Sequence, residues 1–417
     1  MTSASSDRPK LDIARRSIRR GWTVVASAFV VMFATFGCAY SFSAFFASLQ
    51  ASFAASRGEL SWVLSIAISL FFVVGALSGP VADRIGPRAM AITGALIVGI
   101  GLFVAGEAEA LWQVYLGFGL GIGIGVGISY VPSVGAVQRW FIRQRGLASG
   151  IAVAGIGAGT LVMPKVAEWL IAGYGWRAAY WMLGAFAVLA AGTAGLFLDN
   201  SPQRHGFLPD GGIASGETTA AHRAEGAALR DALRSRPFVL LYAATVCTSF
   251  GLFLPFAHLT PFAEDRGIAH ATAVTLFTLV GVGSTFGRFL LGGLADRMGR
   301  RRSFATMLFG MALMLAWWVF SSTAWQIALF ALVFGSCYGG FVALAPALIV
   351  DYFGERNASG LIGIAYTAVA FGTLAGSPLT GYAFDFLGSY TLPIAISAAA
   401  MFAGSVLMFC APDPAKA

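Results

Sequence analysis

The sequence predicts an all-α, polytopic membrane protein in which twelve transmembrane helices form two pseudo-symmetric bundles of six. Three observations predict this fold class: the composition, the spacing of the apolar segments and an internal repeat. Of the 417 residues, 58% are hydrophobic and only 11% are charged, and the mean hydropathy is +0.77. Ordinary soluble domains carry roughly 25% charged residues, so we expect most of the protein surface to face lipid.

The apolar segments have the length of membrane-spanning helices. Crossing a bilayer takes about 20 apolar residues, because hydrocarbon offers no hydrogen-bond partner to free backbone groups. Segments of this kind occur on both sides of one long polar stretch, residues 199–236. The expected helices are residues 22–49, 60–82, 89–106, 111–137, 146–170 and 177–198 in the first half, and 238–263, 270–295, 303–322, 325–350, 356–381 and 390–411 in the second.

The charge distribution predicts the topology. Most of the 27 Lys and Arg residues fall in the amino-terminal tail, the polar stretch and the even-numbered connections, whereas the opposite side keeps Arg57, Arg177 and Arg266. Positive residues favour the cytoplasmic side, so we expect a multi-pass protein of the cell membrane with both termini in the cytoplasm. Its predicted parts are a tail (1–21), a first bundle (22–198), a linker (199–236), a second bundle (237–411) and a tail (412–417). The net charge of +8 does not predict nucleic-acid binding, because the arginines form short clusters between apolar runs.

A ten-residue motif occurs twice, once in each half. Residues 79–88 read GPVADRIGPR, and residues 292–301 read GGLADRMGRR. Gly79 and Gly292 would permit close helix approach, and Gly86 and Gly299 would permit tight turns. The acidic residues Asp83 and Asp296 are placed to pair with nearby bases, namely Arg84, Arg88, Arg143, Arg145, Arg297, Arg301 and Arg356.

The repeated motif resembles the loop signature of the major facilitator superfamily, which lies between helices 2 and 3 and again between helices 8 and 9. This resemblance implies a transporter fold and a charge network that holds the cytoplasmic side closed. Residues 140–155, WFIRQRGLASGIAVAG, resemble the segment that enters the fifth helix of monocarboxylate porters, with Gln144 where that family usually has a base. The pattern is nearer to bacterial monocarboxylate and oxalate/formate carriers than to the animal porters. The resemblance therefore implies a small carboxylate as the substrate.

One charged residue is predicted to lie near the membrane midplane. Arg288 precedes Asp296 by eight residues, or about 12 Å along a helix. Ionisable residues at that depth are costly and usually functional, and a guanidinium suits bidentate binding of a carboxylate. Alternatively, Arg288 is a structural residue whose donors bind backbone carbonyls or an acidic side chain elsewhere. The resemblance favours substrate binding, because monocarboxylate porters carry an essential Arg on this helix. One buried cation predicts a monocarboxylate, and residues 361–381 lack the Lys that oxalate-exchanging relatives carry there.

Several other polar residues are candidates for the same site. Lys165 could contact substrate, or snorkel or pair with Glu168. His258 could titrate and couple transport to protons, or simply cap a proline-broken helix; animal porters have an Asp that takes part in proton coupling where this chain has Ser284. Four tyrosines have hydroxyls that could bind substrate or rings that merely pack. They are Tyr40, Tyr130, Tyr338 and Tyr366.

Together these features predict a secondary active transporter that moves a lactate- or pyruvate-like monocarboxylate by alternating access, as a proton symporter. The alternatives are a carboxylate exchanger and a drug or cation exporter, although the best acidic candidate for an exporter, Glu168, lies near a helix edge. Nothing predicts an enzyme or a sensor, and the histidine and cysteine spacing predicts no metal site. We expect no cofactor, a functional monomer, and the substrate, protons and the lipid bilayer as partners.

Overall fold

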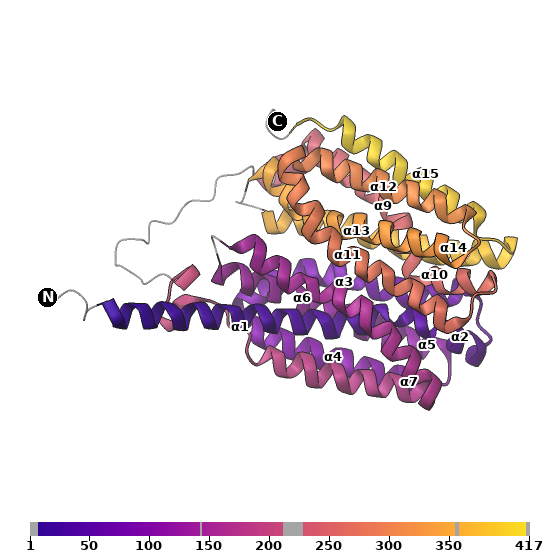
Figure 1. Cartoon of the computed structure of the whole chain (residues 1–417), viewed down its shortest axis with the longest axis horizontal. Coiled ribbons are helices and arrows are strands. Elements are labelled where there is room, and N and C mark those ends of the chain that lie inside the picture. The colour runs from indigo at the N-terminus through magenta and orange to yellow at the C-terminus, as the bar shows by residue number, and fades with distance from the viewer. Residues whose placement is uncertain (1–6, 142–143, 212–227, 355–357, 414–417) are drawn as a thin grey trace.

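The computed structural model describes residues 7–141, 144–211, 228–354 and 358–413, nearly all of them helical (Figure 1). The first half contains α1 (Asp7–Tyr40), α2 (Phe42–Phe53), α3 (Arg57–Ile85), α4 (Pro87–Gly106), α5 (Leu111–Val114), the π-helix η1 (Tyr115–Leu120), α6 (Gly121–Trp140) and α7 (Arg145–Gly195). Two 3-10 helices and a short helix follow: η2 (Pro202–His205), η3 (Pro209–Gly211) and α8 (Leu229–Arg234). The second half contains α9 (Arg236–Leu252), α10 (Leu254–Asp265), α11 (His270–Met298), α12 (Arg300–Phe320), α13 (Ala324–Phe353), α14 (Ala358–Leu387) and α15 (Thr391–Cys410).

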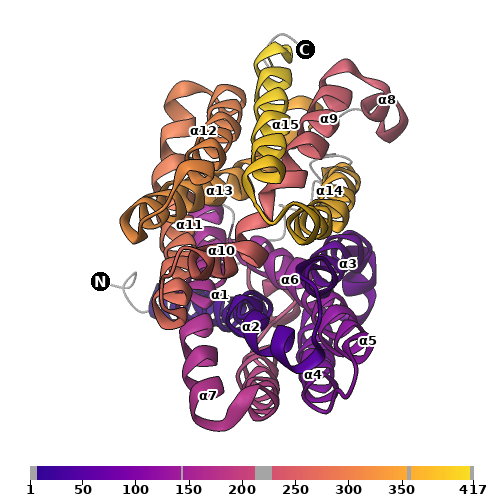
Figure 2. The ribbon, with the colours of Figure 1, turned by 90° about the vertical axis from the view of Figure 1, so that its right-hand side faces the viewer.

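The helices pack as two groups (Figure 2). In the first bundle α1 lies along α7, α4 packs on α6 and α7, and α3 packs on α6. In the second bundle α9 packs on α14 and α15, α11 packs on α13, and α12 packs on α13 and α15. The bundles meet most extensively through two helix pairs, α3 with α14 and α7 with α11, and α2 also packs on α10. Side chains from these and neighbouring helices therefore face one another across the interface.

Ten helical segments of the described residues are long and apolar enough to cross a membrane. One of them, Gly146–Gly195 within α7, spans 50 residues, far more than one crossing requires. Gly175 interrupts its helical backbone with φ 79° and ψ 161°, and this break falls between the predicted helices 146–170 and 177–198. Helix α11 is not among the ten, and its side chains at 289–297 lie outside the described part. The fold is that of a multi-pass helical membrane protein.

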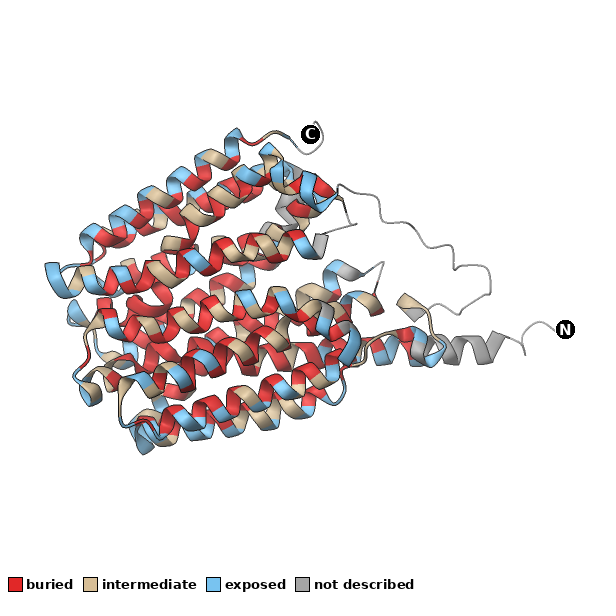
Figure 3. Cartoon of the chain, turned by 180° about the vertical axis from the view of Figure 1, so that it is seen from behind, coloured by how far each residue is buried: buried red, intermediate tan, exposed pale blue. Residues whose placement is uncertain are grey.

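Large apolar side chains cover the outer faces of the bundles, where Figure 3 shows exposed residues along the helices. Ile100 on α4 is 63% exposed and Leu189 on α7 is 67% exposed, and Leu313 and Leu379 present similar surfaces on α12 and α14. In water such continuous apolar exposure would be unfavourable. It matches the lipid contact expected from the composition.

Two helices are broken where they pass the bundle interface. Ser41 separates α1 from α2, and Phe253 separates α9 from α10 with φ −105° and ψ 5°. Pro255, which has no backbone N–H, follows the second break. Irregular backbone within a membrane is tolerated where protein surrounds it or where it lines a cavity. These breaks place Tyr40 and Phe253 at the cavity described below.

The repeated motif forms the same turn in both halves. Gly86 joins α3 to α4 with φ 94° and ψ 150°, and Gly299 joins α11 to α12 with φ 85° and ψ 134°. Residues with a side chain rarely adopt this positive φ, which glycine adopts freely. The structure thus has the tight turns that the repeat predicts, and they lie at the end of the molecule where α1 begins and α15 ends (Figure 1). We call this the proximal end and the opposite end the distal end.

Candidate functional site

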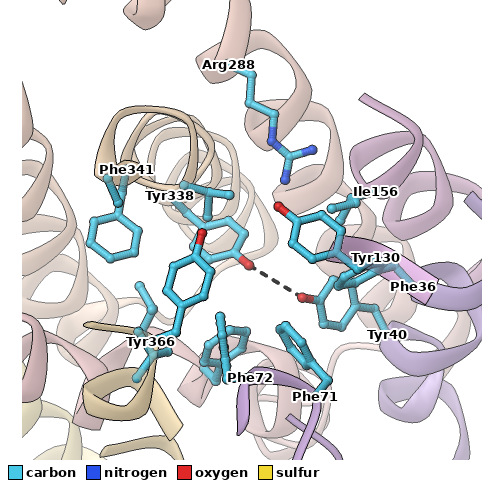
Figure 4. Close-up of a pocket in the computed structure, with 15 residues that line it drawn as sticks. Phe36, Tyr40, Phe71, Phe72, Tyr130, Ile156, Arg288, Tyr338, Phe341 and Tyr366 are labelled. Carbon is cyan, nitrogen blue, oxygen red and sulfur yellow. Dashed lines mark hydrogen bonds between the residues drawn. The ribbon is translucent and has the colours of Figure 1, made fainter. Parts of the chain in front are cut away.

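A cavity lies between the two bundles, at the level where α1 meets α2 and α9 meets α10. The first bundle contributes side chains of α1, α3, α6 and α7, and the second contributes side chains of α9, α11, α13 and α14, together with Phe253 at the α9–α10 break. Figure 4 shows aromatic rings on most sides of the cavity and one guanidinium entering it. The lining residues are Phe36, Tyr40, Phe71, Phe72, Tyr130, Ile156, Leu252, Phe253, Arg288, Tyr338, Phe341, Val342, Ala345, Tyr366 and Val369.

Among the residues whose side chains the structure describes, Arg288 supplies the only charged one of this lining. The residue is 7% exposed, and its Nη1 donates a hydrogen bond of 2.6 Å to the backbone carbonyl of Val153 on α7. Its Nε and Nη2 are buried and have no hydrogen-bond partner among the described residues. Nε–H and Nη2–H point from the same edge of a guanidinium, which is the edge that binds the two oxygens of a carboxylate. Arg288 is thus anchored across the bundle interface by one nitrogen and keeps a bidentate edge free.

All four candidate tyrosines line the same cavity. Tyr40 and Tyr130 come from the first bundle, and Tyr338 and Tyr366 come from the second. The hydroxyls of Tyr40 and Tyr338 lie 3.4 Å apart and form a hydrogen bond between the bundles. Figure 4 shows the Arg288 guanidinium directed towards the Tyr130 hydroxyl. The cavity therefore combines one cation with several neutral hydrogen-bonding groups.

Aromatic rings hold these tyrosines in place. Phe36 packs edge-on against Tyr130 with ring centroids 5.4 Å apart, and Phe72 packs against Tyr366 at 5.3 Å. Such tilted and edge-to-face contacts are favourable beyond the apolar area that they bury. The sequence interpretation did not single out these phenylalanines, because 35 Phe residues are scattered through the apolar runs. Their helical spacing offered a signal: Phe36 precedes Tyr40 by one turn and so shares its face.

His258 and Lys165 do not line the cavity. His258 is fully buried near the distal end, where it contacts Ser61, Ser377 and Tyr390. Lys165 forms a 3.1 Å salt bridge with Glu168, one turn further along α7, and donates to a backbone carbonyl of α11. Lys165 thus makes the pairing that was the alternative to substrate contact.

The side chains of the proximal motif are described only in part. Arg301 donates to the carbonyls of Phe409 at 2.8 Å and of Ala411 at 2.6 Å, so it satisfies the carboxyl-terminal end of α15. At Gly79 a side chain would fit, because an added Cβ would lie 4.0 Å from the nearest atom of Val131; close approach is not seen there. Most residues of the repeated motif and of its predicted charge network lie outside the part of the chain whose side chains are described. They are Asp83, Arg143, Arg145, Gly292, Asp296, Arg297 and Arg356. The contacts of Arg84 and Arg88 remain predictions.

A mostly aromatic cavity lies between two helical bundles, and one buried guanidinium enters it. This arrangement indicates a membrane carrier. Known proteins support this class. The sequence profile of the Major Facilitator Superfamily matches residues 28–294 and 239–417. The chain belongs to this superfamily, as the repeated motif predicted.

Similar proteins indicate which members of the superfamily this chain resembles. Monocarboxylate transporter 13 of Bos taurus is 26% identical over 396 residues, which are 94% of this chain and 89% of the relative. Monocarboxylate transporter 11 of Homo sapiens is 26% identical over 402 residues, covering 94% and 83% of the two chains. These similarities confirm the predicted resemblance to monocarboxylate porters. Both relatives are animal proteins, so the nearer likeness to bacterial and oxalate/formate carriers stays a prediction.

A solved structure supports the fold. A bacterial homologue of the human lysosomal transporter Spinster, in an inward-facing and unoccupied conformation, superposes with a TM-score of 0.69 at 15% identity. The match covers 94% of this chain and 95% of that one.

Proposed function

We propose that this chain is a secondary active transporter that moves a small monocarboxylate, of the size of lactate or pyruvate, by alternating access. In this proposal the bundles at residues 22–198 and 237–411 rock around the cavity between them, and residues 199–236 link them in the cytoplasm. Ten segments of the described chain are long and apolar enough to cross a membrane. If α7 crosses twice and α11 crosses once in addition, the chain crosses the cell membrane twelve times. Both termini then lie in the cytoplasm, and the distal end lies outside the cell. The predicted concentration of positive residues at the proximal end supports this orientation.

The free edge of Arg288 carries the proposal. A buried cation is costly unless an anion or several hydrogen-bond acceptors compensate it. Arg288 has one such acceptor, the Val153 carbonyl, and no acidic partner among the described residues. A substrate carboxylate would supply the missing charge and two acceptors at once. A single guanidinium in the lining suits one carboxylate.

The remaining lining suits the rest of such a substrate. The hydroxyls of Tyr40, Tyr130 and Tyr338 are able to donate to or accept from a 2-hydroxy or 2-oxo group, while the phenylalanines and Ile156 offer contact to a short apolar chain. A cationic drug would meet the positive charge of Arg288, and the described residues of the lining include no carboxylate to offset it. The cavity therefore favours a carboxylate over a cation.

Uptake into proteoliposomes tests this function. The purified chain is reconstituted and given radiolabelled lactate, pyruvate, acetate, benzoate and oxalate, with and without an inward proton gradient. We expect accumulation of at least one monocarboxylate, driven by the gradient and abolished by a protonophore, and little transport of oxalate. If no carboxylate accumulates or exchanges, the proposed function is wrong.

Exchange of carboxylates is the alternative that the same experiment separates. The resemblance to oxalate/formate carriers supports it, as does Ser284 at the position where animal porters have an acidic residue. An exchanger would take up label only into liposomes preloaded with unlabelled carboxylate, and a protonophore would leave that uptake unchanged. A symporter would accumulate label in liposomes without preloaded substrate.

A further inference from the structure

A cluster of polar contacts ties the two bundles together at the distal end, away from the cavity. Arg57, at the start of α3, forms a bidentate ion pair with Asp265, the last residue of α10: Nη1 lies 2.5 Å from Oδ2 and Nη2 lies 2.6 Å from Oδ1. Nη1 also donates to the Tyr390 hydroxyl at 2.9 Å, and the guanidinium lies 4.0 Å from the ring centroid of Phe384. The Arg57 side chain is only 13% exposed. Bidentate charge-assisted pairs of this kind are among the stronger polar contacts in proteins.

A second carboxylate of the same bundle binds the backbone of α3. The amide N–H of Arg57 donates to Asp385 Oδ1 at 3.0 Å, and that of Gly58 donates to Oδ2 at 2.9 Å. Free amides and the helix dipole make a helix amino terminus favourable for an anion. Asp385 therefore caps a helix of the first bundle from the second bundle, and these contacts are lost if the bundles separate.

His258 lies next to this cluster, and its hydrogen bonds define its protonation state. Ser61 Oγ donates to the Arg57 carbonyl at 2.6 Å, so it can only accept from His258 Nε2, 3.2 Å away. Nε2 also lies 2.9 Å from the carbonyl of Ser377, which is likewise an acceptor. Nε2 must therefore carry a proton.

In a neutral imidazole the other ring nitrogen, Nδ1, is then an acceptor. Nδ1 lies 3.2 Å from the Tyr390 hydroxyl, whose oxygen accepts from Arg57 Nη1. A complete chain of bonds results if Arg57 donates to Tyr390 and Tyr390 donates to an unprotonated Nδ1 of His258. The closed arrangement thus matches a neutral imidazole.

A proton on Nδ1 would disrupt this chain. The Tyr390 oxygen would then face two donors, Arg57 Nη1 and His258 Nδ1, and its own hydrogen would lose its acceptor. The new positive charge would also lie close to Arg57. Two charged side chains act on His258, namely Arg57 on α3 and Asp385 on α14. Of the other helices packed around it, α2 presents the ring of Phe46. Among the described residues, α9, α11 and α13 bring no charged side chain to His258.

We propose that Arg57, Asp265, Asp385 and Tyr390 form the distal gate of the transporter, and that the gate opens when His258 takes up a proton. Lower pH on the distal side therefore favours the open gate, and neutral His258 favours the closed gate seen here. The proposal rests on the proposed alternating access, but not on the identity of the substrate. It assigns a function to the distal cluster and gives His258 a role outside the cavity.

Distance measurement between spin labels tests this gate without any substrate. Labels are placed on cysteines at Glu107, after α4, and at Ala324, at the start of α13, in a background whose four native cysteines are replaced; both positions are exposed and lie on opposite bundles. The protein in lipid nanodiscs is measured at about pH 8 and about pH 5, on either side of the ordinary histidine pKa of about 6.5. We expect the fraction with long distances to grow severalfold at the lower pH. An identical distribution at both pH values would overturn the proposal, whatever the variants show.

Substitutions assign the effect to residues. Arg57→Gln should raise the ratio of open to closed gate by about tenfold or more at both pH values, since it removes several charge-assisted bonds. His258→Gln should leave the distribution independent of pH. The matched controls are Arg266→Gln and His270→Gln, because Arg266 packs on Phe262 and His270 binds Glu264, both within the second bundle. A pH response that survives His258→Gln, or one that His270→Gln removes, would contradict the role of His258.

Failure of this proposal and failure of the proposed function are distinguishable. The label distances require no carboxylate, so a pH-dependent gate in a chain that transports no carboxylate would leave the gate intact and overturn only the substrate. Conversely, monocarboxylate uptake with an unchanged label distribution would overturn the gate alone.

Discussion

Replacing Arg288 by Lys probes the geometry of the site rather than its charge. Lysine keeps one positive charge but has no planar edge with two parallel N–H groups. The variant should lose one of the two charge-assisted bonds to the substrate carboxylate, each worth about 1.5–3 kcal/mol. Since about 1.4 kcal/mol corresponds to a factor of ten in affinity, we expect monocarboxylate binding to weaken by roughly 10- to 150-fold.

The assay is equilibrium binding of the transported monocarboxylate to the purified protein, with thermal unfolding as the check on folding. Arg288→Gln, which removes the charge as well, should bind more weakly than Arg288→Lys. The matched control is Arg177→Lys, because Arg177 also donates to a backbone carbonyl, that of Ala108 at 2.9 Å, but lies outside the cavity. Undiminished affinity in a folded Arg288→Lys protein would refute the bidentate geometry, and undiminished affinity in Arg288→Gln would remove Arg288 from the site.

Three further predictions concern the cavity and the packing around it. Tyr338→Phe should weaken binding of a 2-hydroxy acid relative to the unsubstituted acid by about 2- to 10-fold, because one neutral hydrogen bond is lost; equal losses for both acids would contradict this. Lys165→Gln should change substrate affinity less than about twofold, measured by the same binding assay, because Lys165 lies outside the cavity. Gly339→Val should lower the free energy of unfolding by about 1–3 kcal/mol or more, since a Cβ at Gly339 would collide with the backbone carbonyl of Ser284; an unchanged unfolding midpoint in detergent would show that α11 and α13 adjust freely.

The sequence predicted the features that depend on local chemistry. The length of apolar runs located the helices, because each must satisfy its own backbone in lipid, and the depth of Arg288 along its helix placed it near the level of the cavity. The two glycines that precede α4 and α12, Gly86 and Gly299, were identifiable from the repeat. The four tyrosines were candidates because their hydroxyls could bind a substrate, and all of them line the cavity.

Other features depend on contacts between distant parts of the chain. Arg57 binds Asp265, 208 residues away, and nothing in either segment indicates the pairing. His258 was identified as a candidate. The residues around it in the sequence are mostly apolar on every face of the helix, so the sequence did not show that His258 faces the distal contacts rather than the cavity. The π-helix at Tyr115–Leu120 was also missed, because a run rich in glycine and apolar residues gives no local signal for a change of helical register.

A structure of the protein with a bound monocarboxylate would test the central claim most directly. The account predicts that the two carboxylate oxygens lie about 2.7–2.9 Å from Nε and Nη2 of Arg288, while Nη1 keeps its bond to the Val153 carbonyl. A carboxylate bound elsewhere, or an Arg288 edge occupied by an acidic side chain of the protein, would contradict it.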